Sequence, residues 1–141
     1  MHRAETILEA VKTELTGLAT TASRVERDRV YPPEACPALS VEQGDELPAD
    51  EGNIAFQDSA LDVDVIAYVK SDSFNTQCNQ IRAEVYAAMM GNRTLGLAFV
   101  HDTRWLGDGR PEPSGDAETK TLRVSMRFRV FYRHSYTSKE A

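Results

Sequence analysis

The sequence predicts an α+β fold, in which a mostly antiparallel sheet has two helices packed on one of its faces. Two segments, 7–18 and 74–89, repeat apolar residues at the three- and four-residue spacing of amphipathic helices. A third segment, 122–133, alternates apolar and polar residues as a half-buried strand does. The connections between predicted strands are too short for parallel crossovers, except through the second helix. A chain of 141 residues, 41% of them hydrophobic, predicts one domain over residues 1–141.

The first elements are a helix and two strands. Gly17 weakens the last turn of the helix, and a strand is expected from Ser23 to Tyr31, where two consecutive prolines end it by removing backbone donors. A second strand is expected from Ala38 to Gln43. A solvated loop from Gly44 to Asn53, rich in Gly, Asp, Glu and Pro, follows it. The apolar face of the helix consists of Ile7, Leu8, Val11, Leu15 and Leu18.

The middle of the chain predicts a long strand and the second helix. The strand is expected from Ile54 to Val69, with an interruption near Asp58 as an open alternative, and its core face consists of Leu61, Val63, Val65, Ala67 and Val69. Asp72 or Ser73 caps the helix, and the Gly91-Asn92 pair ends it. The apolar positions of this helix are Phe74, Cys78, Ile81, Val85 and Met89.

The last third of the chain predicts two strands and a loop between them. A strand from Leu95 to Leu106 leads into an exposed loop from Gly107 to Ala117, and the long alternating strand of residues 122–133 follows. One face of that final strand is expected in the core. Its members Val124, Met126, Phe128 and Val130 are expected to pack against Val63 and Val65 or against the helices that carry Val11, Leu15, Ile81 and Val85.

Composition excludes several classes of protein. The net charge of -6 and the sequence pI near 5.1 argue against an autonomous DNA- or RNA-binding protein, which needs a basic surface. Residues 1–25 show no signal-peptide pattern and no stretch is apolar enough to span a membrane, so we expect synthesis in the cytoplasm and no membrane partner. Cys36 and Cys78 are expected to be free thiols.

The sequence predicts no enzyme, no metal and no cofactor. His2, His101 and His134 are scattered, without the spacing of metal ligands or a catalytic triad. The glycines near residues 91–96 lack the Lys and Ser or Thr of a phosphate-binding loop, and those at 107–109 do not open a helix. A small-ligand enzyme that uses Asp62, Asp64 and His101 is the alternative from another class.

The charged residues are the most informative candidates. Arginines at 123, 127, 129 and 133 share one face of the last strand, while the acidic residues from Glu42 to Asp64 come with no intervening Lys or Arg. One interpretation is a surface balanced within the subunit, with Asp62 and Asp64 across from arginines of a neighbouring strand. The other is a protein interface, because separate acidic and basic patches suit head-to-tail rings. The interface candidates are Asp45, Glu46, Asp50, Glu51, Asp62, Asp64, Asp108, Arg110, Arg123, Arg127, Arg129 and Arg133.

The order of elements resembles the lambda-like tail terminator family of long-tailed phages. The resemblance spans nearly the whole chain. Besides the two helices and the final alternating strand, it rests on Arg29-Val30-Tyr31-Pro32-Pro33 leading into Cys36-Pro37-Ala38-Leu39-Ser40-Val41. The arginine-lined last strand departs from that family.

The resemblance implies a structural protein that assembles as a six-membered ring on the last tail-tube ring and stops tube polymerisation. The implied partners are further copies of itself, the major tail tube protein, the head-completion (stopper) protein and the tape measure protein, with double-stranded DNA passing through the lumen. The implied location is the virion, at the tail or neck, after assembly in the host cytoplasm. The resemblance favours the interface interpretation of the charged residues. We expect the loops 44–53 and 107–117 to be docking sites. Another ring-forming head-tail connector is the alternative within the same class.

Overall fold

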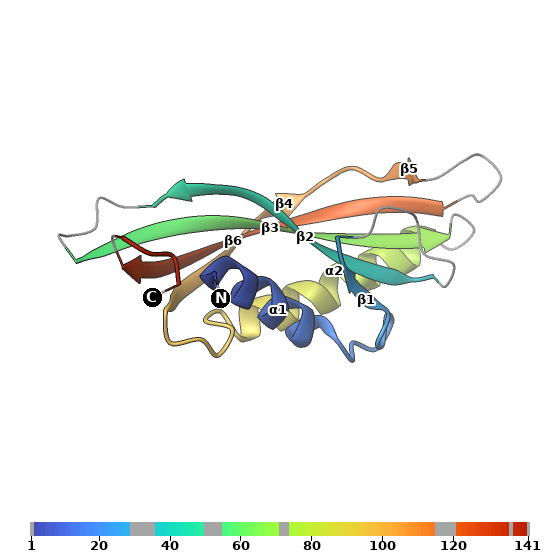
Figure 1. The fold of residues 1–141 in the computed structure, drawn as a ribbon. Coiled ribbons are helices and arrows are strands. Elements are labelled where there is room, and N and C mark those ends of the chain that lie inside the picture. The colour runs from blue at the N-terminus through green and yellow to red at the C-terminus, as the bar shows by residue number, and fades with distance from the viewer. Residues whose placement is uncertain are drawn as a thin grey trace.

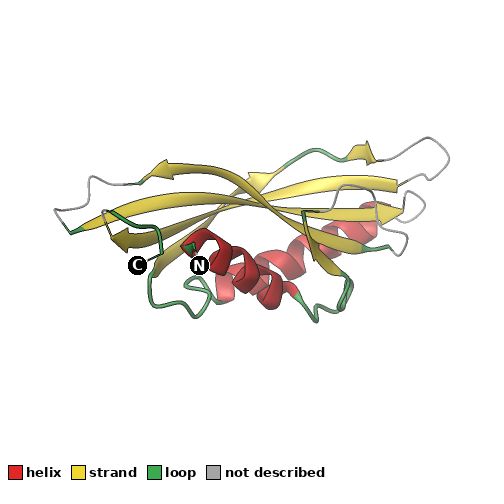
Figure 2. Ribbon diagram, in the orientation of Figure 1, coloured by secondary structure: helices red, strands yellow, loops and turns green. Residues whose placement is uncertain are grey.

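A computed structural model describes residues 2–28, 36–49, 55–70, 74–114, 121–135 and 137–140. Two helices lie side by side beneath one long, twisted sheet and cover one of its faces (Figures 1 and 2). The predicted α+β class, with both helices on one face, is therefore confirmed. Neither of the described helices is long and apolar enough to cross a membrane.

The elements follow one another in the order helix, three strands, helix, three strands. In chain order they are α1 (Arg3–Leu15), β1 (Val25–Arg27), β2 (Ala38–Pro48), β3 (Phe56–Lys70), α2 (Phe74–Gly91), β4 (Val100–Asp108), β5 (Glu112–Ser114) and β6 (Thr121–Ser135). The strands lie in the order β1-β2-β3-β6-β4, and β5 pairs with β6 beyond the end of β4. All neighbours are antiparallel except β1 and β2, which are parallel.

The core lies between the sheet and the helices. The central strands β3 and β6 pair along their whole lengths, so that Val63 lies opposite Phe128 and Val65 opposite Met126. The predicted inward residues of β6 are at most 1% exposed and share one apolar cluster with predicted residues of both helices: Ile7, Leu8, Val11 and Leu15 of α1, and Cys78, Ile81, Val85 and Met89 of α2. The core-facing side of β6 is thus the predicted one, because its two-residue period allows only one side to be apolar.

Two expectations for the first half of the chain were wrong. The first strand covers only Val25–Arg27, because Asp28 takes a left-handed backbone conformation (φ 52°) that ends it. Residues 44–48, expected in a loop, continue β2 instead, after a β-bulge between Gln43 and Glu46. Gly44 fits this bulge because a Cβ there would lie 3.1 Å from Asp62. The Pro32-Pro33 pair and the rest of that loop, residues 50–53, lie outside the described residues.

The second half also differs in its strand boundaries. β3 runs without interruption through Asp58 and Ser59, since every residue from 56 to 70 finds a partner on β6. β4 begins at Val100 rather than Leu95, which has a left-handed backbone (φ 54°). In the expected loop from Gly107 to Ala117, residues 107–108 belong to β4 and residues 112–114 form β5. Residues 115–117 are not described. α2 ends at Gly91 as predicted, and its expected cap residues 72 and 73 are not described.

Candidate interaction surface

The face of the sheet turned away from the helices carries most of the predicted site residues. Because side chains alternate along a strand, the aspartates of β3 and the arginines of β6 project from this face while their neighbours enter the core. No helix of the described residues covers it (Figure 2). We call it the open face.

Three Asp-Arg pairs cross from β3 to β6 on the open face. The ladder register places Asp58 opposite Arg133, Asp62 opposite Arg129 and Asp64 opposite Arg127. In each pair the arginine Nε lies near a carboxylate oxygen, at 2.9, 2.7 and 3.3 Å respectively. The expectation that Asp62 and Asp64 lie across from arginines of an antiparallel neighbour is confirmed.

In these pairs the carboxylate lies closer to the sheet and the guanidinium lies further out toward solvent. The three aspartate side chains are 15 to 24% exposed, whereas their arginines are 34 to 65% exposed. A guanidinium has five N–H donors, and a bidentate pair uses two of them. The open face therefore presents the outer edges of these arginines to solvent, above the carboxylates with which they pair.

Two shifted pKa values reflect this pairing. The hydrogen bonds from Arg133 lower the pKa of Asp58 below its ordinary value; partial burial opposes the shift and His101 adds to it. The hydrogen bond to Asp62 raises the pKa of Arg129. Each shift favours the charged form of its own group, the Asp58 carboxylate and the Arg129 guanidinium.

Other predicted site residues lie elsewhere. Glu46 projects to the helix side, where it accepts hydrogen bonds from the Tyr132 hydroxyl and from Lys139 Nζ, the latter at 2.8 Å. Asp45 is exposed in the bulge of β2. Asp108 lies toward α2, accepts a hydrogen bond from Trp105 Nε1 at 3.0 Å and lies 3.7 Å from Arg82 Nε. Asp50 and Glu51 lie outside the described residues.

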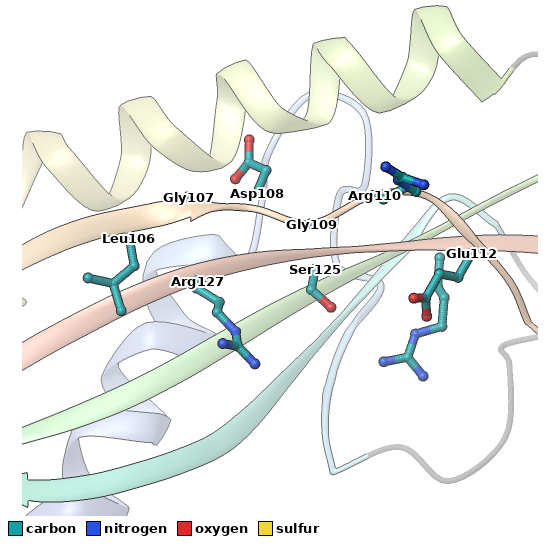
Figure 3. A pocket seen from close by; sticks show the side chains of 9 residues that line it. Leu106, Gly107, Asp108, Gly109, Arg110, Glu112, Ser125 and Arg127 are labelled. Atoms are coloured by element: carbon teal, nitrogen blue, oxygen red, sulfur yellow. The ribbon is translucent and has the colours of Figure 1, made fainter.

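A polar hollow of about 340 Å³ lies beside the end of β4. Four of its lining side chains lie on the side of the strands that faces away from α2: Leu106, Ser125, Arg127 and Glu112 (Figure 3). Asp108 points the opposite way, toward α2. Arg110 and Arg123 also line the hollow. Five of the predicted interface residues thus lie near β4 and β5, namely Asp108, Arg110, Arg123, Arg127 and, through its pair with Arg127, Asp64. Of the other described candidates, three lie on the open face and two on β2: Asp62, Arg129 and Arg133, and Asp45 and Glu46.

Sequence patterns missed an exposed apolar patch at the free edge of β4. It consists of Tyr86 from α2 and Trp105 from β4 on the helix side and of Leu106 from β4 on the opposite side of the strand, which are each between 43 and 47% exposed. The Tyr86 and Trp105 rings meet edge to face, with centroids 5.7 Å apart. The available signal was the chain's one tryptophan, in a strand whose apolar residues do not alternate. We call these three residues the β4 edge patch.

The three residues on which the enzyme hypothesis depends, Asp62, Asp64 and His101, do not come together in one site. His101 Nε2 lies 3.2 Å from Asp58 Oδ1, while Asp62 and Asp64 each bind their own arginine. His134 is buried and lies between Ser59 Oγ (2.9 Å) and the Ser135 carbonyl (2.8 Å), as a structural histidine does. Across the described part of the chain, no three His, Cys, Asp or Glu side chains are grouped as metal ligands would be, and Cys36 and Cys78 are free thiols.

Comparison with known proteins shows a shared fold. No family model matches the sequence, and no curated protein is significantly similar to it. Among solved structures, the chain is similar to one chain of the virion of a native gene transfer agent (GTA) particle, with a TM-score of 0.57 and 17% sequence identity. The match covers 94% of this chain and 88% of the other. At this identity the two chains share an architecture.

Proposed function

We propose that the chain is a structural subunit of a phage-like virion particle, and that within the particle it is the tail terminator. In this role it forms a ring, a homohexamer, on the last ring of the tail tube and ends tube polymerisation. It then presents its other side to the head-completion protein. Its chemistry is recognition between proteins, without a catalytic step.

The likeness to a chain of the GTA virion carries this proposal. It extends over 94% of the chain rather than over one common motif. The order of elements in the sequence, which resembles the tail terminator family, supports the narrower role. These two arguments are independent, because one rests on backbone geometry and the other on sequence.

The surface is also of the kind that a ring subunit needs. No described helix covers the open face of the sheet, and the β4 edge patch leaves aromatic side chains in solvent. Aromatic residues and arginines are the side chains that most often dominate protein interfaces. Because the patch and the open face lie on different parts of one chain, they can bind two neighbours at once.

The test is to mix the purified chain with tubes polymerised from its cognate tube protein and to image the tube ends by electron microscopy. A terminator gives a ring of the same diameter on one end of each tube. A head-tail connector instead binds tubes only after a terminator is present. A chain that binds no tube end and forms no ring contradicts both roles and reopens the enzyme alternative.

A further inference from the structure

The sheet has two uncovered edges that run in opposite directions. β1 pairs with β2 only through residues 39–41, so the rest of β2, residues 42–48, has no strand on its outer side among the described residues. β4 has β6 on one side and no described strand on the other. Since β2, β3, β6 and β4 alternate in direction, β2 and β4 are antiparallel to each other.

The two edges also lie at the same height in the sheet. Following the ladders across β3 and β6, Gln43 is level with Trp105, Glu46 with Thr103 and Pro48 with Val100. A second copy can be placed beside the first with its helices on the same side of the sheet and without a shift along the strands. This placement brings the β2 strand of the second copy against the β4 strand of the first. The two strands would be antiparallel, with matching faces.

The charges on the two edges are complementary at one specific level. The bulge of β2 that contains Asp45 is level with Asp62, which lies opposite Arg129, and Arg129 lies opposite Arg104 of β4. Asp45 is exposed, and the Arg104 side chain is 67% exposed. Asp102 of β4 is bound within the subunit by Arg93 at 2.7 Å and lies 3.6 Å from Arg104 Nε, so that Arg104 shares its carboxylate with a second arginine.

Apolar side chains are exposed at both edges. Leu47 of β2 is 52% exposed, and the β4 edge patch provides Trp105 and Leu106. A long edge strand with exposed apolar residues invites pairing with another chain unless charges or a covering element block it. The described edge of β4 has no lysine and no proline.

We infer that the free half of β2 of one copy pairs with β4 of the next, so that the sheet continues from subunit to subunit. This inference rests on the proposal that the chain forms a ring. The contact is heterologous, because β2 and β4 are different surfaces, and a heterologous contact closes into a ring when its rotation closes. Asp45 of one copy meets Arg104 of the next at the centre of the joint.

Single-cysteine cross-linking tests the joint. Leu47→Cys on β2 and His101→Cys on β4 are each made in a Cys36→Ser background, where the remaining thiol, Cys78, is 2% exposed. A bismaleimide with a spacer of about 10 Å tolerates a slip of roughly two residues, since a strand rises about 3.3 Å per residue. Glu9→Cys, on the exposed side of α1, is the matched control. Reactions are run on the free protein and on tube ends.

The expected result is a cross-linked dimer when Leu47→Cys and His101→Cys are mixed, and no dimer from either variant alone. The variant that carries both cysteines gives a ladder of higher multimers, and Glu9→Cys mixed with either partner gives none. Dimer formation by His101→Cys alone indicates a two-fold β4-to-β4 contact and overturns the inference. So does the absence of any cross-link. If the protein caps tubes but no cross-link forms, the β2-β4 contact is refuted and the proposed function is not. If the cross-link forms but the protein caps no tube, the proposed function is refuted and the contact is not.

Discussion

Arg129 and Asp62 face each other across the two central strands and are joined by two hydrogen bonds, of 2.7 and 3.2 Å. The pair sits between Asp58-Arg133 and Asp64-Arg127, so each of these three aspartates is paired with an arginine inside one subunit. A partner that docks here meets the outer edges of arginines rather than free carboxylates. These aspartates and arginines, whose partners lie 63 to 75 residues apart in the sequence, therefore form one set of ion pairs.

Breaking the Asp62-Arg129 pair is expected to cost less than about 1 kcal/mol, because cross-strand charge pairs at a partly exposed face contribute roughly 0.2–1 kcal/mol. Urea unfolding of Asp62→Asn, Arg129→Gln and the double variant gives the coupling energy of the pair. Tube capping by Asp62→Asn, Asp64→Asn and His101→Asn is expected to change no more than their stability does. Loss of capping in a stable, ring-forming variant would indicate a chemical site.

Phe128→Ala is expected to destabilise the domain by about 3–5 kcal/mol, since a fully buried phenylalanine leaves a cavity when it is truncated. Phe128 is 1% exposed in the core between the sheet and the helices. The matched control is Phe131→Ala on the same strand, whose ring lies on the open face with the Arg104 guanidinium carbon 5.0 Å from its centroid. That contact is worth roughly 0.5–1 kcal/mol. Equal losses for the two variants in chemical denaturation would contradict the assigned faces of β6.

Asp58 makes stability depend on pH in the acid range. Its pKa is lowered in the folded state, chiefly by hydrogen bonds from Arg133, so its contribution is complete above the unfolded value of about 3.9 and is lost as the pH falls through the folded value. The difference in urea midpoint between wild type and Asp58→Asn should therefore be largest near neutral pH and shrink below about pH 4. A difference that stays constant or grows on acidification would show that Asp58 is not held ionised by Arg133.

Exchanging two charges tests the joint between subunits. Asp45→Arg and Arg104→Asp each place like charges together at the proposed β2-β4 contact and should reduce ring formation, measured by sedimentation in the presence of tubes. The double variant restores opposite charges and should recover ring formation. Lys12→Glu, on α1 and so away from both edges and from the open face, is the control and should leave assembly unchanged. Two single variants that assemble normally would contradict the contact.

Much of the fold follows from residue periodicity. The two-residue alternation of β6 and the helical spacing in both helices predicted the core, including Phe128 and Val85, because burial on one side constrains each position. The failures lie at β1, β2 and β4. A glycine-rich, charged segment predicts a loop, yet the pairing partner on β3 and the bulge at Gly44 keep residues 44–48 in the sheet. Local composition carries no information about such a partner.

The site was predicted less completely than the fold. The Asp-Arg pairs could be anticipated, because two strands with opposite charges on their polar faces pair readily when they are antiparallel. The β4 edge patch could not, because its three residues come from α2 and β4 and their exposure depends on where the sheet ends. Which strand lies at an edge is a property of the topology rather than of the strand's own residues.

Arrest of tube growth tests the central claim most directly. Tube protein is allowed to polymerise, the chain is added while growth continues, and tube length is followed by electron microscopy over time. We predict that tubes stop lengthening on addition of the chain and that each arrested tube carries a ring at one end. Tubes that continue to lengthen at the same rate, with or without bound protein, would contradict a terminator role.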